Sequence, residues 1–264
     1  MNDGFLFHRK TREVLNRHAA EGYAVVVPLA ATEQHGPYLP VFTDSIIGNH
    51  IALEACRKAS STMKLLLAPT LTIGCSQHHL AFGGTLSFTS STYLAMLNDI
   101  GESLVRGGFR KIIFLNAHGG NEPLMHQAAQ DLAVKHDIWT ASSSYWSLSR
   151  TALNEQNAQD MGMVPGHAGG FEASLVAALE PDWIEAPDRA AQPLHPQRSW
   201  INAGPAGSFV GKHGQLTGAD GYTDGYTHAD AVKGAECLQS IIQSTASWLE
   251  QVVNWMNERM EVEG

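Results

Sequence analysis

The stretch "VVVPLAATEQHGPYLPVFTDS", residues 25–45, opens with an apolar run and continues into a polar loop. A short apolar run bounded by turn residues is typical of a strand that is buried on both faces. Within a dozen residues, the loop after this strand carries Glu33, His35 and Asp44. We therefore expect a central strand that leads directly to three side chains able to bind a metal ion.

The rest of the chain predicts an α/β fold around this strand. Apolar runs predict strands at residues 24–30, 64–70, 111–117 and 138–146, and helical periodicity covers residues 45–60, 91–106, 122–136, 170–179 and 229–256. Strands that alternate with helices of this length indicate a mostly parallel sheet with helices on both faces. We expect a single domain over residues 1–264, in which the Gly-, Pro- and Asp-rich segment 181–226 forms an irregular cover or a subunit contact.

Composition excludes several classes of partner. The 264 residues carry a formal net charge of −9, and the 17 Lys and Arg residues are scattered, so we expect no nucleic-acid partner. The apolar run at residues 24–31 is far too short to span a bilayer, and we expect no membrane association. Three widely spaced cysteines form no disulfide framework, which favours a cytoplasmic protein.

Polar clusters follow each predicted strand. They are "TEQHG" after the first strand, "GCSQHH" after the second, "NAHGGNE" after the third and "SYWS" after the fourth. Ligands of open α/β sheets bind beyond the carboxyl ends of the strands, where loops and helix N-termini converge. The four clusters therefore mark one predicted active site.

Four residues of these clusters have the chemistry of a two-metal site. Glu33 and His35 are two residues apart, so in extended backbone their side chains share a face, about 6.5 to 7 Å apart at the Cα atoms. That spacing suits two ions about 3.5 to 4 Å from each other. Asp44 could return and bridge them, and His118 could supply an end ligand. Carboxylates and imidazoles without thiolate suit Zn²⁺, Mn²⁺ or Fe²⁺.

Each of the four also has a structural interpretation. Asp44 could be the N-cap of its helix. Glu33 could be a solvated loop charge, His35 a turn residue, and His118 a buried core histidine. The metal interpretation is favoured because all four lie where the fold independently places an active site.

Other residues of the clusters predict a substrate pocket. Adjacent side chains diverge, so of His78 and His79 we expect only His79 to face the site. Trp146, at the end of a predicted strand, is expected to wall the pocket. Asn121, in "HGGNEP", either caps the following helix or belongs to a turn that holds an anionic ligand. We assign His79, Asn121 and Trp146 to substrate binding.

Two further residues lie in "PGHAGGFEAS". His167 is a candidate proton shuttle, since an imidazole with a pKa near about 6.5 can take and give a proton at neutral pH. Glu172 is either a first-turn carboxylate favoured by the helix dipole or a functional residue.

At this point the chain resembles the creatininase family of metal-dependent amidohydrolases. The resemblance rests on "TEQHGPYLPVFTDS", "FGGTLS", "NAHGGNE", "SYW" and "HAGGFEASLVAALEP", and spans roughly residues 24–182. It implies a three-layer α/β/α sandwich, often a homohexamer. It also implies a two-metal centre held by Glu33, His35, His118 and a bridging Asp44.

The chain departs from creatininase itself at informative positions. Gly119 and Gly120 stand where creatininase has Tyr-Glu, and that Glu is a metal ligand, so one ligand is missing at position 120. Glu172 is our candidate replacement. Gly166 stands where creatininase has a Glu, and Gly83 replaces a Pro. These changes argue against carrying creatinine over as the substrate.

The residues and the resemblance together predict a dinuclear metal amidohydrolase. We expect it to cleave a non-peptide C–N bond, in a cyclic amide or formamide of a small polar molecule, with water activated by the metal ions. His167 would donate a proton to the leaving nitrogen. The alternatives are a metal hydrolase of another bond, such as a cyclic ketone C–C bond or a phosphoester, and a non-catalytic protein that binds metal or an anion.

Overall fold

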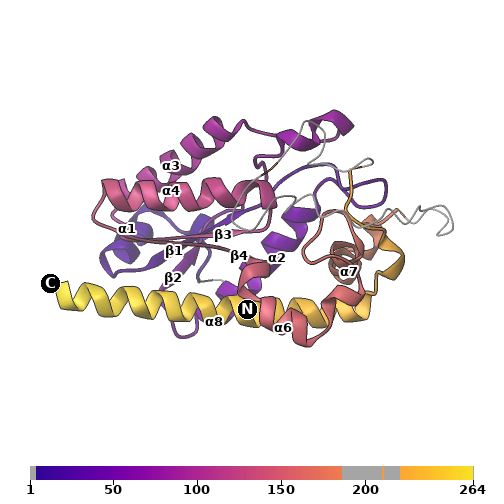
Figure 1. Ribbon diagram of the computed structural model, residues 1–264. Coiled ribbons are helices and arrows are strands. Elements are labelled where there is room, and N and C mark those ends of the chain that lie inside the picture. Colours follow the sequence, from indigo (N-terminus) through magenta and orange to yellow (C-terminus); the bar gives the residue numbers. More distant parts are fainter. Residues whose placement is uncertain (1–3, 186–209, 211–220, 264) are drawn as a thin grey trace.

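The computed structural model describes residues 4–185, 210 and 221–263, and its centre is a four-stranded sheet (Figure 1). The strands are β1 (Ala24–Leu29), β2 (Leu65–Leu67), β3 (Lys111–Asn116) and β4 (Trp139–Ser144), in the order β2-β1-β3-β4. All neighbouring pairs are parallel, which confirms the predicted sheet. Every residue of β1 and β3 is buried, as expected of central strands covered on both faces.

All five predicted helices are present, together with three further helices that were not predicted. The helices are α1 (Arg12–Ala20), α2 (Thr43–Ala59), α3 (Ser90–Arg106), α4 (Glu122–Lys135), α5 (Tyr145–Leu148), α6 (Arg150–Glu155), α7 (Gly170–Leu179) and α8 (Ala231–Glu263). The three that were not predicted are α1, α5 and α6. Short 3-10 turns include η2 (Gln77–Phe82), η3 (Gly119–Asn121), η5 (Pro181–Trp183) and η8 (Tyr226–His228). The fourth strand ends at Ser144 rather than at the predicted residue 146, because Tyr145 already begins α5.

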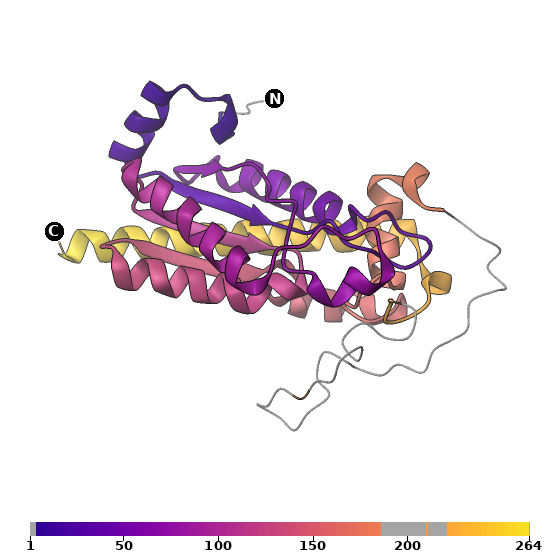
Figure 2. The same cartoon turned by 90° about the horizontal axis from the view of Figure 1, so that it is seen from above.

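Helices cover both faces of the sheet, so the predicted three-layer α/β/α sandwich is confirmed (Figure 1). Alternate residues of β1 face opposite layers, as strand geometry requires. Ala24 and Val26 pack with α2 and α8, whereas Val25 and Val27 pack with α3 and α4. The view from above shows α8 passing along the whole length of the sheet (Figure 2).

The arrangement brings the polar clusters to one edge. In register, Leu29 pairs with Asn116 and Asn116 pairs with Ser144, so β1, β3 and β4 end side by side. Helix α7 packs against α2 and α8 and reaches the same edge. Most of the predicted cover, residues 181–226, lies outside the described residues. Among the described helices, none is long and apolar enough to cross a membrane.

Candidate metal centre

Asp44 lies between two imidazoles at the carboxyl edge of the sheet. Its Oδ1 is 3.3 Å from Nε2 of His35, and its Oδ2 is 3.1 Å from Nδ1 of His118. Glu33 approaches the same histidine, with Oε1 3.2 Å from Nδ1 of His118. All four side chains are buried. The structure therefore brings together the four residues that the sequence predicted to form the site.

Two of the structural interpretations are wrong. The N-cap of α2 is Phe42, and Asp44 is the second residue of the helix, with its side chain directed into the cluster. Asp44 is therefore not the helix cap. Glu33 is 0% exposed, so it is not a solvated loop charge.

The outer nitrogens of the two histidines face backbone carbonyls. Nδ1 of His35 is 3.0 Å from the carbonyl oxygen of Glu33, and Nε2 of His118 is 3.2 Å from that of Cys75. Because a carbonyl only accepts, each outer nitrogen carries the hydrogen. A neutral ring then directs the lone pair of its inner nitrogen at the carboxylates, which is how metal-binding histidines are oriented.

Several buried polar atoms of the cluster are unsatisfied. Within the described part of the chain, Oε1 and Oε2 of Glu33, Nε2 of His35 and Oδ2 of Asp44 have no hydrogen bond of acceptable geometry. Buried polar atoms are otherwise almost always paired, because an unpaired one costs about 1 to 3 kcal/mol. A cation between these atoms would satisfy them, so the donor set fits divalent metal ions.

The electrostatics of the cluster support this interpretation. Burial lowers the pKa of His35, but Asp44, Glu172 and Glu33 outweigh burial and raise it to about 10. Burial also raises the pKa of Glu172 to about 8, with a further contribution from Asp44. Three buried carboxylates around two imidazoles thus strongly favour added positive charge, which protons or metal ions can supply.

Glu172, in the first turn of α7, lies beside His35. Its Oε2 is 3.7 Å from Nε2 of His35 and accepts a 2.6 Å hydrogen bond from the backbone N–H of Ala168. The carboxylate is buried and lines the same cavity as Asp44. Glu172 is therefore placed where a third ligand for an ion next to His35 would be needed.

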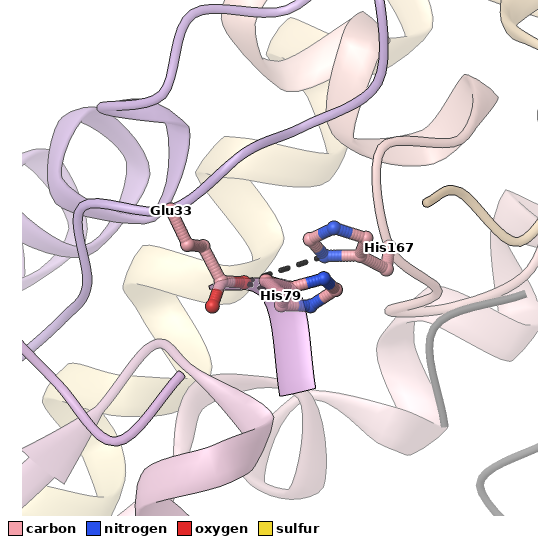
Figure 3. A group of neighbouring side chains, drawn as sticks. All are labelled: Glu33, His79 and His167. Atoms are coloured by element: carbon pink, nitrogen blue, oxygen red, sulfur yellow. Dashed lines mark ion pairs between the residues drawn. The ribbon is translucent and has the colours of Figure 1, made fainter. Parts of the chain in front are cut away.

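His167 and His79 lie next to the carboxylate of Glu33 (Figure 3). Nδ1 of His167 is 3.4 Å and Nε2 of His79 is 3.6 Å from Oε1 of Glu33. Nε2 of His167 donates to the carbonyl of Gln34 at 3.0 Å, so a neutral ring directs the Nδ1 lone pair at the cluster. Glu33, His79 and His167 also form a possible metal-binding group, as do His35, His167 and Glu172.

Gln34 is a site residue that the sequence reasoning missed. Its side-chain amide donates to Nδ1 of His79 and to the carbonyl of Gly221, each at 2.7 Å. Burial lowers the pKa of His79 to about 4, so this ring is neutral and accepts the hydrogen bond. Only the position of Gln34 between two predicted ligands in "TEQHG" could have indicated that it belongs to the site.

A cavity of about 440 Å³ opens onto the cluster. The described residues that line it are Glu33, Asp44, His78, His79, Ala117, His118, Gly119, Gly120, Glu122, Pro123, Trp146, Pro165, Gly166, His167 and Glu172. His78 lines it together with His79, so the expectation that only one of them faces the site is wrong. Both lie in the 3-10 turn η2, where adjacent side chains do not alternate as they do in a strand.

Of two residues predicted to bind substrate, Trp146 lines the cavity and Asn121 does not. The contact of Trp146 with substrate stays a prediction. Asn121 is fully buried, and its amide donates to the carbonyl of Ala30 and accepts from the backbone N–H of Cys75. It forms no side-chain cap on α4. Asn121 thus ties together the loops below the pocket, and a substrate contact there stays a prediction.

Comparison with known proteins places the chain in a family. The family model described as "Creatininase: Creatinine amidohydrolase" matches residues 8–249. The chain belongs to the creatininase family. A solved structure of "Creatininase Mn" has the same fold, with a TM-score of 0.76 at 24% identity over 94% of this chain and 98% of that chain.

Curated relatives within the family have different names. The mycofactocin precursor peptide peptidase of Mycobacterium ulcerans (strain Agy99) is 27% identical over 166 residues, covering 61% of this chain and 60% of that protein. The creatinine amidohydrolase of Pseudomonas putida is 26% identical over 189 residues, covering 66% of this chain and 71% of that protein. The chain spans between 41% and 60% of the length of the first curated relatives that it matches.

Position 120 of this creatininase-family chain has no room for a side chain. A Cβ atom on Gly120 would lie 2.2 Å from the carbonyl oxygen of Cys75 and 2.6 Å from Nε2 of His118. Real Cβ atoms essentially never come that close, so a carboxylate at this position would require the backbone to move. Residue 120 therefore cannot supply a carboxylate ligand with the backbone in this position.

Proposed function

We propose that this chain is a metal-dependent hydrolase that cleaves a C–N bond other than a peptide bond, in a cyclic amide or formamide of a small polar molecule. The main support is the placement of Asp44, with one carboxylate oxygen toward His35 and the other toward His118. Two ions that share one carboxylate are typical of two-metal hydrolases. Membership of the creatininase family supports the same reaction class, because one relative is a creatinine amidohydrolase.

The residues divide into two sets of three around Asp44. Glu33, Asp44 and His118 would hold one ion. His35, Asp44 and Glu172 would hold the other, with Glu172 in place of the ligand missing at Gly120. When bound, divalent ions of this kind lower the pKa of a bound water and polarise a carbonyl group. We expect Zn²⁺, and the donor set also suits Mn²⁺ or Fe²⁺.

His167 would move the proton. Burial and the neighbouring His35 lower its pKa well below the ordinary value, so the ring is neutral before reaction. Its Nε2 hydrogen is engaged by the carbonyl of Gln34, which leaves Nδ1 facing Glu33 and the cluster. Nδ1 can therefore accept a proton and later donate it to the leaving nitrogen, as a general base and then a general acid.

The cavity argues against two of the alternatives, a non-catalytic binding protein and a phosphoester hydrolase. A metal site closed to other molecules would favour a non-catalytic protein, whereas here a cavity of about 440 Å³ reaches the cluster. The described residues lining it include no Lys or Arg, the side chains that usually hold phosphate groups, which disfavours a phosphoester.

A second candidate is hydrolysis of a peptide bond. It is favoured by the names of four curated relatives, all mycofactocin precursor peptide peptidases, two of them 36% identical over 104 residues. The chemistry at the metal centre would be the same, since both substrates are amides. Only the shape and charge of the substrate pocket would differ.

Metal analysis followed by a substrate screen tests both candidates. Purified protein should contain two divalent ions per subunit and should release formate, ammonia or an amine from a panel of formamides, lactams and cyclic ureides. Cleavage of short peptides with no cleavage of this panel would move the assignment to the second candidate. We further propose that the protein is cytoplasmic and forms a homo-oligomer, a hexamer by family resemblance. Light scattering would test the oligomeric state.

A further inference from the structure

One carboxylate in the cavity has no part in the proposed chemistry. Glu122, the first residue of α4, lines the cavity and is half-buried. Its Oε1 accepts a 2.7 Å hydrogen bond from the hydroxyl of Ser144. No hydrogen bond reaches its Oε2 within the described part of the chain. One oxygen of Glu122 is thus fixed and the other is available.

Buried side chains hold Glu122 in a defined position relative to the metal centre. Ser144 accepts a 3.0 Å hydrogen bond from the side-chain amide of Asn116, and Asn116 in turn accepts one from the backbone N–H of His118 at 3.1 Å. Ser144 and Asn116 are at most 1% exposed. This chain of hydrogen bonds connects Glu122 to a candidate metal ligand, so the carboxylate is preorganised rather than mobile.

The charges that line the cavity are unbalanced at Glu122. Glu33, Asp44 and Glu172 belong to the metal centre, where divalent ions would neutralise them. Of the described lining residues none is Lys or Arg, so Glu122 faces the cavity without a cationic partner there. A carboxylate in such a place favours a ligand that carries a positive charge and N–H donors.

An aromatic side chain follows two residues after Ser144, the hydrogen-bond partner of Glu122. Trp146 also lines the cavity, and its ring packs edge-on against buried Tyr145 with the centroids 5.0 Å apart and an interplanar angle of 81°. That contact limits the orientations open to the indole. A carboxylate combined with an aromatic face is a recurrent way of binding an ammonium group.

We propose that Glu122, with Trp146, binds a protonated amino group of the substrate, so the substrate class is a small amide that carries a primary ammonium group. This inference rests on the proposed amide hydrolysis at the metal centre, and it assigns Glu122 as a specificity-determining residue. A carboxylate in the first turn of α4 would also interact favourably with the helix dipole. That role would stabilise the fold, but it would not discriminate between substrates.

Three formamides of similar length and different charge provide the test: N-formyl-1,3-diaminopropane (cationic), N-formylbutylamine (neutral) and N-formyl-β-alanine (anionic). We expect metal-loaded protein to prefer the cationic compound over the neutral one by about tenfold in kcat/KM, as one charge-assisted hydrogen bond allows. Glu122→Gln should abolish this preference by raising KM for the cationic compound alone, with metal content unchanged. Glu13→Gln, which alters a first-turn carboxylate of α1, is the matched control and should keep the preference.

A binding measurement separates this inference from the proposed reaction. Calorimetry at pH 7 would compare n-butylammonium with n-butanol, which differ in charge, on metal-loaded wild type and on Glu122→Gln. Suppose that no formamide is cleaved but that butylammonium binds about tenfold more tightly to the wild type than to Glu122→Gln. The proposed reaction would then be wrong, and the cation site at Glu122 would be supported. Equal binding of butylammonium to both proteins would overturn the site. So would a Glu122→Gln variant that loses thermal stability and activity toward all three formamides alike.

Discussion

The two halves of the candidate metal centre share Asp44 but are built differently. In the first half, Nδ1 of His118 lies 3.1 Å from Asp44 and 3.2 Å from Glu33. In the second half, Nε2 of His35 lies 3.3 Å from Asp44 but 3.7 Å from Glu172. The first half comes from loops that leave the neighbouring strands β1 and β3, whereas the second also requires a carboxylate from α7. The sheet fixes one half, and helix packing fixes the other.

The carboxylates of the two halves also differ in their hydrogen bonds. Neither oxygen of Glu33 has a hydrogen bond within the described residues, so both remain available to a cation. Glu172 already accepts from the backbone of Ala168, and burial raises its pKa to about 8. Because one oxygen of Glu172 is already engaged, and because Glu172 lies farther from His35 than Glu33 lies from His118, we expect the second half to bind its ion more weakly.

The largest effect should follow from Asp44→Ala, which removes the residue common to both halves. We expect the loss of both ions and of all measurable turnover, since each remaining set would keep only two protein ligands. Elemental analysis of the purified variant measures metal per subunit, and circular dichroism checks the fold. Asp99→Ala, on the exposed face of α3, serves as control and should retain both ions. Two metals per subunit in Asp44→Ala would show that Asp44 bridges nothing.

Glu172→Gln should separate the two halves. A neutral amide of the same size keeps the packing of α7 but is a poor metal ligand, so we expect one ion to be retained and the other lost. Metal titration followed by calorimetry should then show one tight site where the wild type shows two unequal sites. Retention of both ions with unchanged affinities would leave Glu172 as a carboxylate that only binds the backbone of Ala168.

The same contrast explains what the sequence could predict. The first half was accessible because "AVVVPLA" and "KIIFLNA" are recognisable as buried strands, and residues just beyond neighbouring parallel strands must meet. Both strands were predicted to within one residue of their ends. The proposal that Glu172 is a ligand required the family resemblance, because nothing in local spacing places α7 at the edge of the sheet.

Other features depended on contacts distant in sequence. The amide of Gln34 binds the carbonyl of Gly221, 187 residues away, and no local pattern indicates such a contact. The entry of His78 into the cavity follows from a 3-10 turn that was not predicted. Strand β2 was predicted over residues 64–70 but ends at Leu67, because apolar character alone does not fix where pairing stops.

His167→Ala should affect turnover without affecting either half. We expect metal content near that of the wild type and turnover lowered by about 10² to 10⁴, the usual contribution of general acid–base catalysis. Elemental analysis and steady-state kinetics on the same preparation test both parts. The control is His8→Ala, which alters an exposed histidine near the start of the sequence. It should change neither metal content nor turnover. Loss of an ion from His167→Ala would reassign this residue as a ligand, as its position near Glu33 and Glu172 would permit.

The smallest effect should come from a substitution of Asp224, whose hydrogen bonds hold the loop that carries His167 in place. Its Oδ2 accepts from the backbone N–H groups of Met163 and Gly170, each at 3.3 Å, and its Oδ1 accepts from the hydroxyl of Thr223 at 2.7 Å. Thr223 in turn accepts from the backbone N–H of His167 at 2.9 Å. The carboxylate of Asp224 fits here because residues 162 and 169 are both glycine. A Cβ atom at either position would lie 2.1 to 2.2 Å from a carboxylate oxygen.

Asp224→Asn should therefore weaken the hydrogen bonds that hold this loop, while leaving the metal centre intact. The amide replaces one accepting oxygen with a donor, so at least one buried N–H or hydroxyl loses its acceptor, at a cost of about 1 to 3 kcal/mol in the free energy of unfolding. For a chain of this size that corresponds to a fall in Tm of roughly 2 to 6 °C, measured by calorimetry. We expect kcat to fall by about three- to tenfold, less than for His167→Ala, because His167 is displaced rather than removed. Thr223→Val, which removes the hydroxyl between Asp224 and His167, should lower kcat to a similar extent. If instead Asp224→Asn released the weaker ion, the loop would support Glu172 and the second half of the centre, and its separate role in holding His167 would be wrong.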